Sequence, residues 1–314
     1  MNLDIVIRDS PRILMDGEVL ERLRRENAVS LDPDIMHAAL VYDDSAIDKL
    51  SLAYRDFFDI ATRFGLPLIA TAPTFRSGLD RVSASRFAGK PVNRDCVRFL
   101  RELRDRSSHT SSIYVAGVLG PRNLTYNPRE PLPELESLSY HALQALELAA
   151  GGADLILGLT LSSLSEALGM SRAIAAVDKP FGISFLVDRF GKLPDGTPLV
   201  EAIQKIDEVA PPTFFMLNCC HPSVAYAAIE LHSQHPKIKR LIGVKANTSS
   251  GAPSELEGLP NLDCEQPHIF ANALCRLYDN FGIRMLGGCC GSEAAHIEVL
   301  AHTWSVNLEN KTNS

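Results

Sequence analysis

Residues 154–187 of this chain, DLILGLTLSSLSEALGMSRAIAAVDKPFGISFLV, contain two short apolar runs separated by a longer segment with helical spacing. The runs are Asp154–Thr160 and Phe181–Val187, and the segment between them is Ser163–Val177. Each run is apolar along its whole length, which is typical of a parallel strand that is buried on both faces. Two such strands joined by a crossover helix predict an α/β fold with a parallel sheet.

The same alternation of strand and helix extends in both directions from this stretch. Eight alternations with crossover helices favour a closed (β/α)8 TIM barrel, whose length of 314 residues suits a single domain. We place the barrel at residues 1–305 and a C-terminal tail at 306–314. A doubly wound open sheet is the alternative fold, but no G-x-G-x-x-G follows the first run. The other six runs are Ile13–Gly17, Leu66–Ala72, Ile113–Gly120, Thr213–Cys219, Leu241–Asn247 and Ile283–Cys290.

The composition is that of an ordinary globular protein with a mildly acidic surface. The 38 acidic and 31 basic residues leave a formal charge of −7, which does not suit nucleic acid or an anionic membrane as a partner. No stretch approaches the roughly 18 apolar residues of a membrane helix, and the N-terminus has no signal-peptide core. We therefore expect a cytoplasmic protein that acts on a small molecule and that could form a homo-oligomer.

Three cysteines at the ends of predicted strands are the most informative residues. Cys219 ends the sixth strand, and Cys289 and Cys290 end the eighth, so all three lie on the face where barrel enzymes build active sites. Three thiolates with an open fourth position suit a catalytic Zn²⁺, whereas structural zinc is usually closed by four ligands. The glycines beside Cys289 and Cys290 let the backbone turn so that two successive thiols face one metal. The alternative is a phosphate-binding turn, but such a turn gains nothing from adjacent thiols.

The other four cysteines are expected to pack in the core rather than to bind the metal. In an extended strand, Cys219 and Cys220 point to opposite sides, so we expect Cys219 to face the metal and Cys220 to pack. Cys220 or the following His221 would be the candidate for a fourth ligand if the site were structural. Three other cysteines are expected to be small core residues: Cys96, Cys264 and Cys275.

Two motifs resemble those of a known family. The segment Gly282–Ile297 (GIRMLGGCCGSEAAHI) resembles the closing motif of the homocysteine S-methyltransferase family, and Leu217–Cys219 (LNC) resembles its Asn-Cys motif. The resemblance implies a zinc-binding barrel in which Cys219, Cys289 and Cys290 hold the metal. Weaker matches follow in the family's order at Asp16-Gly17-Glu18, Thr71–Arg76, Ala116–Pro121 and Ser184-Phe185.

The chain also departs from the family pattern. Where the family typically carries Phe-Glu-Thr at the end of the fourth strand, this chain has Gly158-Leu159-Thr160. That glutamate is expected to bind the amino group of homocysteine, which a leucine cannot do. Glu18 stands at the second glycine of the family's Asp-Gly-Gly and could supply a displaced carboxylate. The alternative is a different thiol in the pocket.

Several polar residues near the predicted strand ends are candidates for binding or catalysis. Asp16 could bind a substrate ammonium, orient a cationic donor or merely form a turn, and Asn218 could hold a thiolate or a loop. Arg76 could pair with a substrate carboxylate or only cap the rim. Lys245 and Asn247 could bind substrate or form a polar rim. The candidate catalytic residues are Asp16, Glu18 and Asn218, and the candidate substrate-binding residues are Asp16, Glu18, Thr71, Arg76, Thr160 and Asn247.

These observations predict a zinc-dependent S-methyltransferase. Its partners would be a small thiol, homocysteine first, and a small cationic donor such as S-methylmethionine, S-adenosylmethionine or a betaine. Two alternatives use the same three thiols. One is a zinc hydrolase or lyase, which is chemically poorer because three thiolates make zinc a weak acid toward water. The other is a non-enzymatic thiol- or metal-binding protein, which a fourth protein ligand would distinguish.

Overall fold

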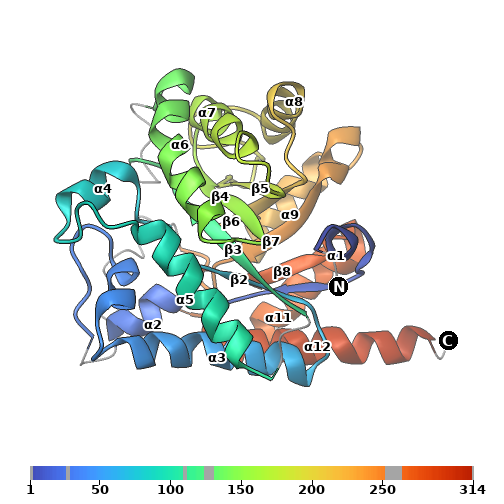
Figure 1. Cartoon of the computed structure of the whole chain (residues 1–314). Helices are drawn as coiled ribbons and strands as arrows, with labels where there is room; N and C mark the ends of the chain where they lie inside the picture. The colour runs from blue at the N-terminus through green and yellow to red at the C-terminus, as the bar shows by residue number, and fades with distance from the viewer. Residues whose placement is uncertain (1–2, 26–28, 109–111, 124–130, 252–263, 313–314) are drawn as a thin grey trace.

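The computed structural model describes residues 3–25, 29–108, 112–123, 131–251 and 264–312, with side chains as far as residue 305. Within them, parallel strands form a closed barrel in which each strand pairs with its neighbours in chain order and β8 pairs with β1 (Figure 1). This confirms the predicted (β/α)8 barrel, and every predicted run contains a strand. The strands are β1 (Ile13–Met15), β2 (Leu68–Thr71), β3 (Ile113–Leu119), β4 (Leu155–Leu161), β5 (Phe181–Phe185), β6 (Phe214–Asn218), β7 (Leu241–Ala246) and β8 (Met285–Gly288).

Helices surround the barrel, and α3 and α12 lie side by side on its outside (Figure 1). The α-helices are α1 (Leu3–Asp9), α2 (Val19–Arg25), α3 (Ile47–Arg63), α4 (Leu79–Ala84), α5 (Val92–Arg106), α6 (Glu134–Ala150), α7 (Leu164–Ala175), α8 (Leu199–Val209), α9 (Pro222–Leu231), α11 (Pro267–Phe281) and α12 (Ala294–Thr312). The 3₁₀ helices η1 (His37–Tyr42) and η3 (Pro236–Arg240) complete the description.

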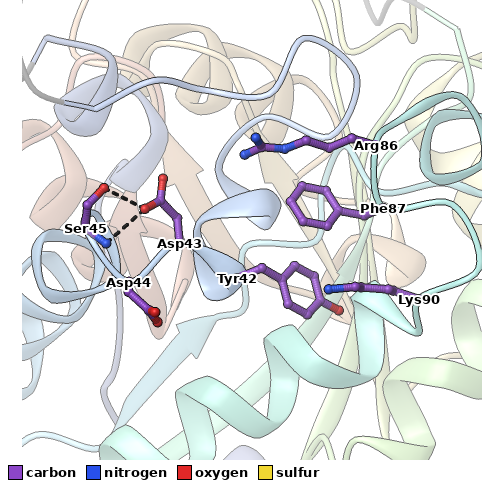
Figure 2. Close-up of a pocket in the computed structure, with 7 residues that line it drawn as sticks. All are labelled: Tyr42, Asp43, Asp44, Ser45, Arg86, Phe87 and Lys90. Carbon is purple, nitrogen blue, oxygen red and sulfur yellow. Dashed lines mark hydrogen bonds between the residues drawn. The ribbon is translucent and has the colours of Figure 1, made fainter.

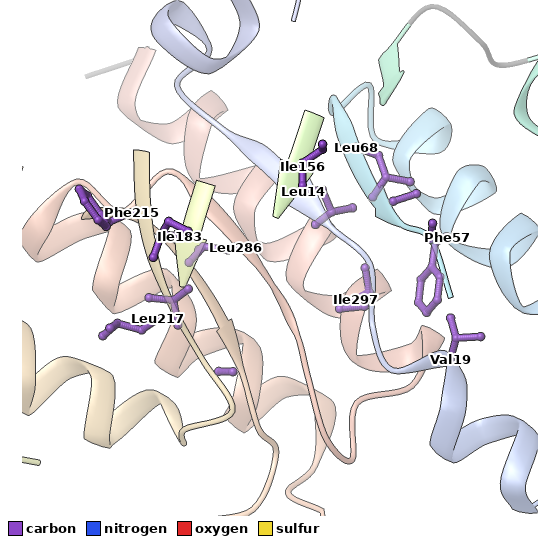
Figure 3. Close-up of a cluster of buried hydrophobic side chains, with 14 of the residues drawn as sticks. Leu14, Val19, Phe57, Leu68, Ile156, Ile183, Phe215, Leu217, Leu286 and Ile297 are labelled. Carbon is purple, nitrogen blue, oxygen red and sulfur yellow. The ribbon is translucent and has the colours of Figure 1, made fainter. Parts of the chain in front are cut away.

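The strands separate two hydrophobic clusters. The outer cluster lies between the strands and the helices and includes Phe215 and Leu217 of β6 (Figure 3). The inner cluster fills the barrel and includes Phe214 and Met216 of the same strand. Successive side chains of a strand point to opposite faces, so a strand that is apolar at every position supplies both clusters. This is the physical reason for the continuous apolar runs in the sequence.

Helix α1 covers the N-terminal end of the barrel. Its apolar residues Leu3, Val6 and Ile7 are buried and belong to the inner cluster together with Ile13 and Met15 of β1. This end of the barrel is therefore closed by hydrophobic packing. The C-terminal ends of the strands lie on the opposite face, where the predicted site residues are.

The structure bears on the predicted end of the barrel and on the predicted burial of three cysteines. Helix α12 continues to Thr312, across the predicted end of the barrel at residue 305, so the division into barrel and tail stays a prediction. Cys96 and Cys275 are buried as expected, but the prediction for Cys264 was wrong because this residue is exposed. It precedes α11, outside the strands and helices whose packing would bury it.

The described helices include none with the length and hydropathy that a membrane crossing requires.

Candidate metal centre

Three cysteine sulfurs converge at the C-terminal end of the barrel. Cys219 follows β6, and Cys289 and Cys290 follow β8. The three Sγ atoms lie within 4.8 Å of one another, and those of Cys219 and Cys289 are 3.1 Å apart. Cys219 and Cys289 are buried, and Leu186 packs against them. The structure thus brings together the three residues that the sequence predicts as metal ligands.

The backbone at Cys219 explains why this thiol faces the site and Cys220 does not. Asn218 continues the inward series of Phe214 and Met216, so strict alternation would turn Cys219 outward. Instead, β6 ends at Asn218 and Cys219 adopts a left-handed conformation with φ of 55°. Cys220 then falls into the outer cluster. A left-handed cysteine is unfavourable and occurs mainly where a functional site requires it.

The loop after β8 is held by short contacts to β1. A side chain on Gly288 would collide with Ser292, and Gly291 has φ of 82°. The Ser292 hydroxyl donates to the carbonyl of Cys289 at 2.6 Å and accepts from the backbone N–H of Glu18 at 3.2 Å. These contacts hold Cys289 and Cys290 in a turn outside the strand, so both thiols can face Cys219.

The three thiols cannot all ionise side by side without a cation. Hydrogen bonding with Cys219 and Cys290 holds the pKa of the Cys289 thiol well below its usual range, and the Lys245 ammonium acts in the same direction. Hydrogen bonding with Cys289 raises the pKa of the Cys219 thiol, and hydrogen bonding with Cys219 and Cys289 raises that of the Cys290 thiol. A divalent ion would replace the shared protons. Zinc–sulfur bonds of about 2.3 Å in a tetrahedron place the sulfurs roughly 3.8 Å apart, which this cluster can accommodate.

Asn218 joins the ends of three strands. Its Oδ1 accepts from the backbone N–H of Thr160 at 2.8 Å and from the Ser184 hydroxyl at 2.6 Å. Its Nδ2 donates to the Thr160 hydroxyl at 2.6 Å, and that hydroxyl donates to the Cys219 sulfur at 3.8 Å. Thr160 has φ of 62° at an irregularity in the pairing of β4 with β5. Asn218 therefore joins the ends of β4, β5 and β6 next to the turn at Cys219, and the hydrogen bonds described for its side chain reach no thiol.

Asp16 is completely buried, and its carboxylate already has partners. Oδ2 accepts from the backbone N–H and from the hydroxyl of Thr71, both at 2.7 Å. Oδ1 lies 3.2 Å from the Nζ of Lys245. Lys245 was expected on a polar rim or against substrate, and the structure places it in the interior as the counter-ion of Asp16.

The other candidates lie around this pair. Glu18 is half-buried, and its Oε1 accepts from the backbone N–H of Leu20 at 3.0 Å. Burial, with the nearby charge of Cys289, raises the pKa of Glu18 to about 7. Asn247 is buried and donates to the carbonyl of Cys219 at 3.0 Å, while its Oδ1 has no hydrogen-bond partner among the described residues. Arg76 is half-buried with its guanidinium over the ring of Phe75.

The two candidates for a fourth protein ligand are engaged elsewhere. Cys220 packs in the outer cluster. His221 caps α9 through Nδ1, and its Nε2 lies 3.2 Å from the Oε1 of Glu265. Among the residues with described positions, the metal-binding group therefore consists of three thiols and leaves a fourth position for another molecule.

The pairing of Lys245 with Asp16 and the role of Ser292 were not predicted from sequence. Lys245 has a visible signal, because a lysine inside the otherwise apolar run LIGVKAN must be paired if the strand is buried on both faces. Ser292 has no such signal, since a serine after a glycine turn is common. Its position becomes apparent only when β8 is placed beside β1.

A cavity of about 550 Å³ is lined by residues away from the thiols (Figure 2). Tyr42 stacks on Phe87, and the cations Lys90 and Arg86 lie over these rings. Such cation–ring contacts stabilise the outer wall between η1 and the segment after α4. The lining of this cavity includes none of the predicted site residues. The residues are Tyr42, Asp43, Asp44, Ser45, Arg86, Phe87 and Lys90.

Comparisons with known proteins agree with this architecture. A family model described as homocysteine S-methyltransferase matches residues 13–304. The chain is 21% identical over 317 residues to homocysteine S-methyltransferase YbgG of Bacillus subtilis, covering 95% of this chain and 96% of YbgG. It is 25% identical over 255 residues to methionine synthase of Mycobacterium leprae, covering 72% of this chain but only 20% of that synthase.

A solved structure shares the fold. The metallated form of the homocysteine methyltransferase MmuM of Escherichia coli superposes with a TM-score of 0.76 at 19% identity, covering 96% of this chain and 100% of MmuM. At this level of identity the likeness supports the barrel fold.

Proposed function

Because this chain belongs to the homocysteine S-methyltransferase family, we propose that it transfers a methyl group from a small cationic donor to a thiol at the three-cysteine centre. The single observation that carries the proposal is the convergence of Cys219, Cys289 and Cys290 around an open position. The family name gives homocysteine as the acceptor. S-methylmethionine, S-adenosylmethionine and betaines are the donors to be tested.

We propose zinc as the resident metal. The donor set is three sulfurs, which zinc accepts, and clustered thiols favour a divalent ion over shared protons. Cys219, Cys289 and Cys290 would hold it. When bound, zinc would lower the pKa of an acceptor thiol and so keep that sulfur nucleophilic at neutral pH.

The protein's own task is to align the two substrates. The acceptor sulfur attacks the methyl carbon, a new S–CH₃ bond forms, and the bond from the methyl group to the donor breaks with its electron pair left on the donor. The acceptor has already released its proton to solvent. Because an anionic sulfur meets a cationic donor, charge is neutralised and little acid–base help is needed. Orientation then provides most of the rate enhancement.

Two features of the site suit this task. The thiol cluster is flanked by the buried side chain of Leu186, so water is excluded from one side of the reacting sulfur. Asn218 and Ser292 fix the loops that carry the cysteines, as described above. A fixed site of this kind orients reactants without large rearrangement.

A methyl-transfer screen would test the proposal. Purified zinc-loaded protein is incubated with each donor and a panel of small thiols, and methylated products are measured by mass spectrometry. We expect a thioether product with at least one donor, its formation abolished in Cys219→Ala and retained in Cys220→Ala. Product formation at the wild-type rate in Cys219→Ala would contradict the assignment of the site.

A further inference from the structure

A lysine of the chain itself lies beside Asp16, the carboxylate that the sequence offers for a substrate ammonium. The Nζ of Lys245 donates to the carbonyls of Asp16 at 2.9 Å and Gly17 at 3.3 Å, and also to that of Gly288. It lies 3.2 Å from the Oδ1 of Asp16. These groups join the end of β7 to the ends of β1 and β8.

This ammonium is resident rather than exchangeable. It has three N–H donors and four oxygen atoms around it, so its hydrogen-bonding capacity is filled. Lys245 is 5% exposed and Asp16 is 0% exposed. Displacing the lysine would leave a buried charge and several carbonyls without partners, which is strongly unfavourable. The second oxygen of Asp16 is filled by Thr71.

The Oδ1 of Asp16 accepts no hydrogen bond among the described residues, but it is buried beside the Lys245 ammonium. A second ammonium entering this region would therefore meet a cation. From this geometry we infer that the acceptor is a small aliphatic thiol without an α-ammonium group, such as a mercaptoalkanoate. The inference rests on the proposed methyl transfer to a thiol at this site, and it replaces homocysteine by a different acceptor thiol. Asp16 and Lys245 neutralise each other, so the pair offers no net negative charge to an amino-bearing thiol that must give up its hydration.

The apolar surroundings of the sulfur point the same way. Leu186 packs against Cys219 and Cys289. Leu159 belongs to the inner cluster and precedes Thr160, whose hydroxyl donates to the Cys219 sulfur. An alkyl chain next to the reacting thiol matches these side chains, whereas an ammonium would lose its hydration there without gaining a partner.

The other polar groups nearby do not replace Asp16. Glu18 uses Oε1 to cap the first turn of α2 through Leu20. The buried Oδ1 of Asn247 is a neutral acceptor, and a neutral oxygen cannot offset a second cation beside Lys245. Glu18 is nevertheless the carboxylate to test, because it is half-buried rather than sealed.

A comparison of the affinities of two matched thiols tests the inference. Homocysteine and 4-mercaptobutyrate differ only in the α-ammonium, and their Kd values are measured by calorimetry on zinc-loaded protein without donor. We expect 4-mercaptobutyrate to bind at least about tenfold more tightly, which corresponds to about 1.4 kcal/mol. Tighter binding of homocysteine would overturn this inference alone. Binding of neither thiol would contradict both this inference and the proposed function.

Variants identify the cause of the preference. Lys245→Met frees Asp16 and should shift the ratio of Kd values toward homocysteine at least about tenfold, whereas Lys237→Met, which removes an outer lysine paired with Asp207, should leave it unchanged. Leu159→Glu should shift the ratio in the same direction, with Leu159→Gln as its uncharged control. Leu159→Glu and Leu159→Gln test the preference for the thiol without an ammonium group if Lys245→Met does not fold. A wild-type preference for homocysteine that disappears in Glu18→Gln would assign the ammonium to Glu18 and refute the inference.

Discussion

The two ends of this barrel are formed by the same strands but differ in the side chains that are buried there. At the N-terminal end, Leu3, Val6 and Ile7 of α1 close the barrel by apolar packing. At the C-terminal end several buried groups are polar or ionisable, and they include Asp16, Lys245, Asn218 and the thiols of Cys219 and Cys289. Apolar packing tolerates changes of shape, whereas buried polar groups must all be paired in one arrangement.

The contrast separates what stabilises the fold from what the site requires. Four described residues other than glycine have positive φ: Cys219 and Thr160 lie at the C-terminal end, whereas Asp178 precedes β5 and Met36 precedes η1. Only the pair at the C-terminal end is joined to the thiols. Such strain persists only when the surrounding structure holds it, here through Asn218 and the neighbouring strands. Changes at the two ends should therefore have different consequences, and the following tests are ordered by the size of the effect.

The largest effect should come from removing a thiol at the C-terminal end. Wild-type protein should purify with close to one zinc per chain, and Cys289→Ser or Cys290→Ser should reduce this below about 0.1, because three sulfurs provide all the described ligands. Elemental analysis measures the metal. Cys220→Ala is the matched control and should keep its zinc, since this thiol packs in the outer cluster. A full complement of zinc in both serine variants would contradict the assignment of these cysteines as metal ligands.

A change at the N-terminal end should affect stability without affecting the metal. Ile7→Ala removes buried methyl groups from the inner cluster and should lower the free energy of unfolding by about 3 kcal/mol, as measured by urea denaturation. Ile5, which is 42% exposed on the same helix, is the control, and Ile5→Ala should change stability by less than about 0.5 kcal/mol. Loss of zinc in Ile7→Ala would show that the two ends are coupled.

The sequence predicts the strands of the barrel better than the backbone conformations at its C-terminal end, and the packing of α1 at the N-terminal end was not predicted. Continuous apolar runs reflect burial on both faces of each strand, so all eight strands could be located from the pattern alone. The three converging cysteines could also be predicted, because barrel topology brings strand ends onto one face. Both inferences depend on average properties of many residues or on topology.

Single backbone conformations could not be predicted in this way. Alternation along β6 selected Cys219 over Cys220, but the physical reason was wrong, since alternation continued from Asn218 would turn Cys219 outward. The left-handed conformation of Cys219 turns its side chain back toward the site, and no residue in the sequence indicates this conformation. The pairing of Asp16 with Lys245 was missed for a related reason, because it joins residues 229 positions apart in the chain.

Loss of the Asn218 side chain should have an intermediate effect at the C-terminal end. Asn218→Ala leaves the N–H and hydroxyl of Thr160 and the hydroxyl of Ser184 without their partner, which should lower the free energy of unfolding by about 2 kcal/mol. Because Thr160 supports Cys219, zinc affinity should fall as well, which a chelator competition would measure. Equal zinc affinity in the variant and the wild type would show that Asn218 contributes only to the fold.

The smallest effect should be a pH dependence that only the C-terminal end shows. Burial and the charge of Cys289 raise the pKa of Glu18 from 4.5 in the unfolded chain to about 7 in the folded one. Between these values the folded protein keeps a proton that the unfolded chain has lost, so this contribution to stability is present below pH 4.5 and is lost as the pH rises through 7. Because solvent reaches the half-buried side chain, we expect a loss of about 1 kcal/mol between pH 5 and 7 in metal-free protein. Glu18→Gln cannot ionise and should lack this loss, so it should be more stable than the wild type at pH 7. The difference in the free energy of unfolding between Ile7→Ala and the wild type should be the same at both pH values. Urea denaturation at pH 5 and 7 measures all three proteins, and parallel behaviour of wild type and Glu18→Gln would mean that solvent stabilises the Glu18 carboxylate at this end of the barrel.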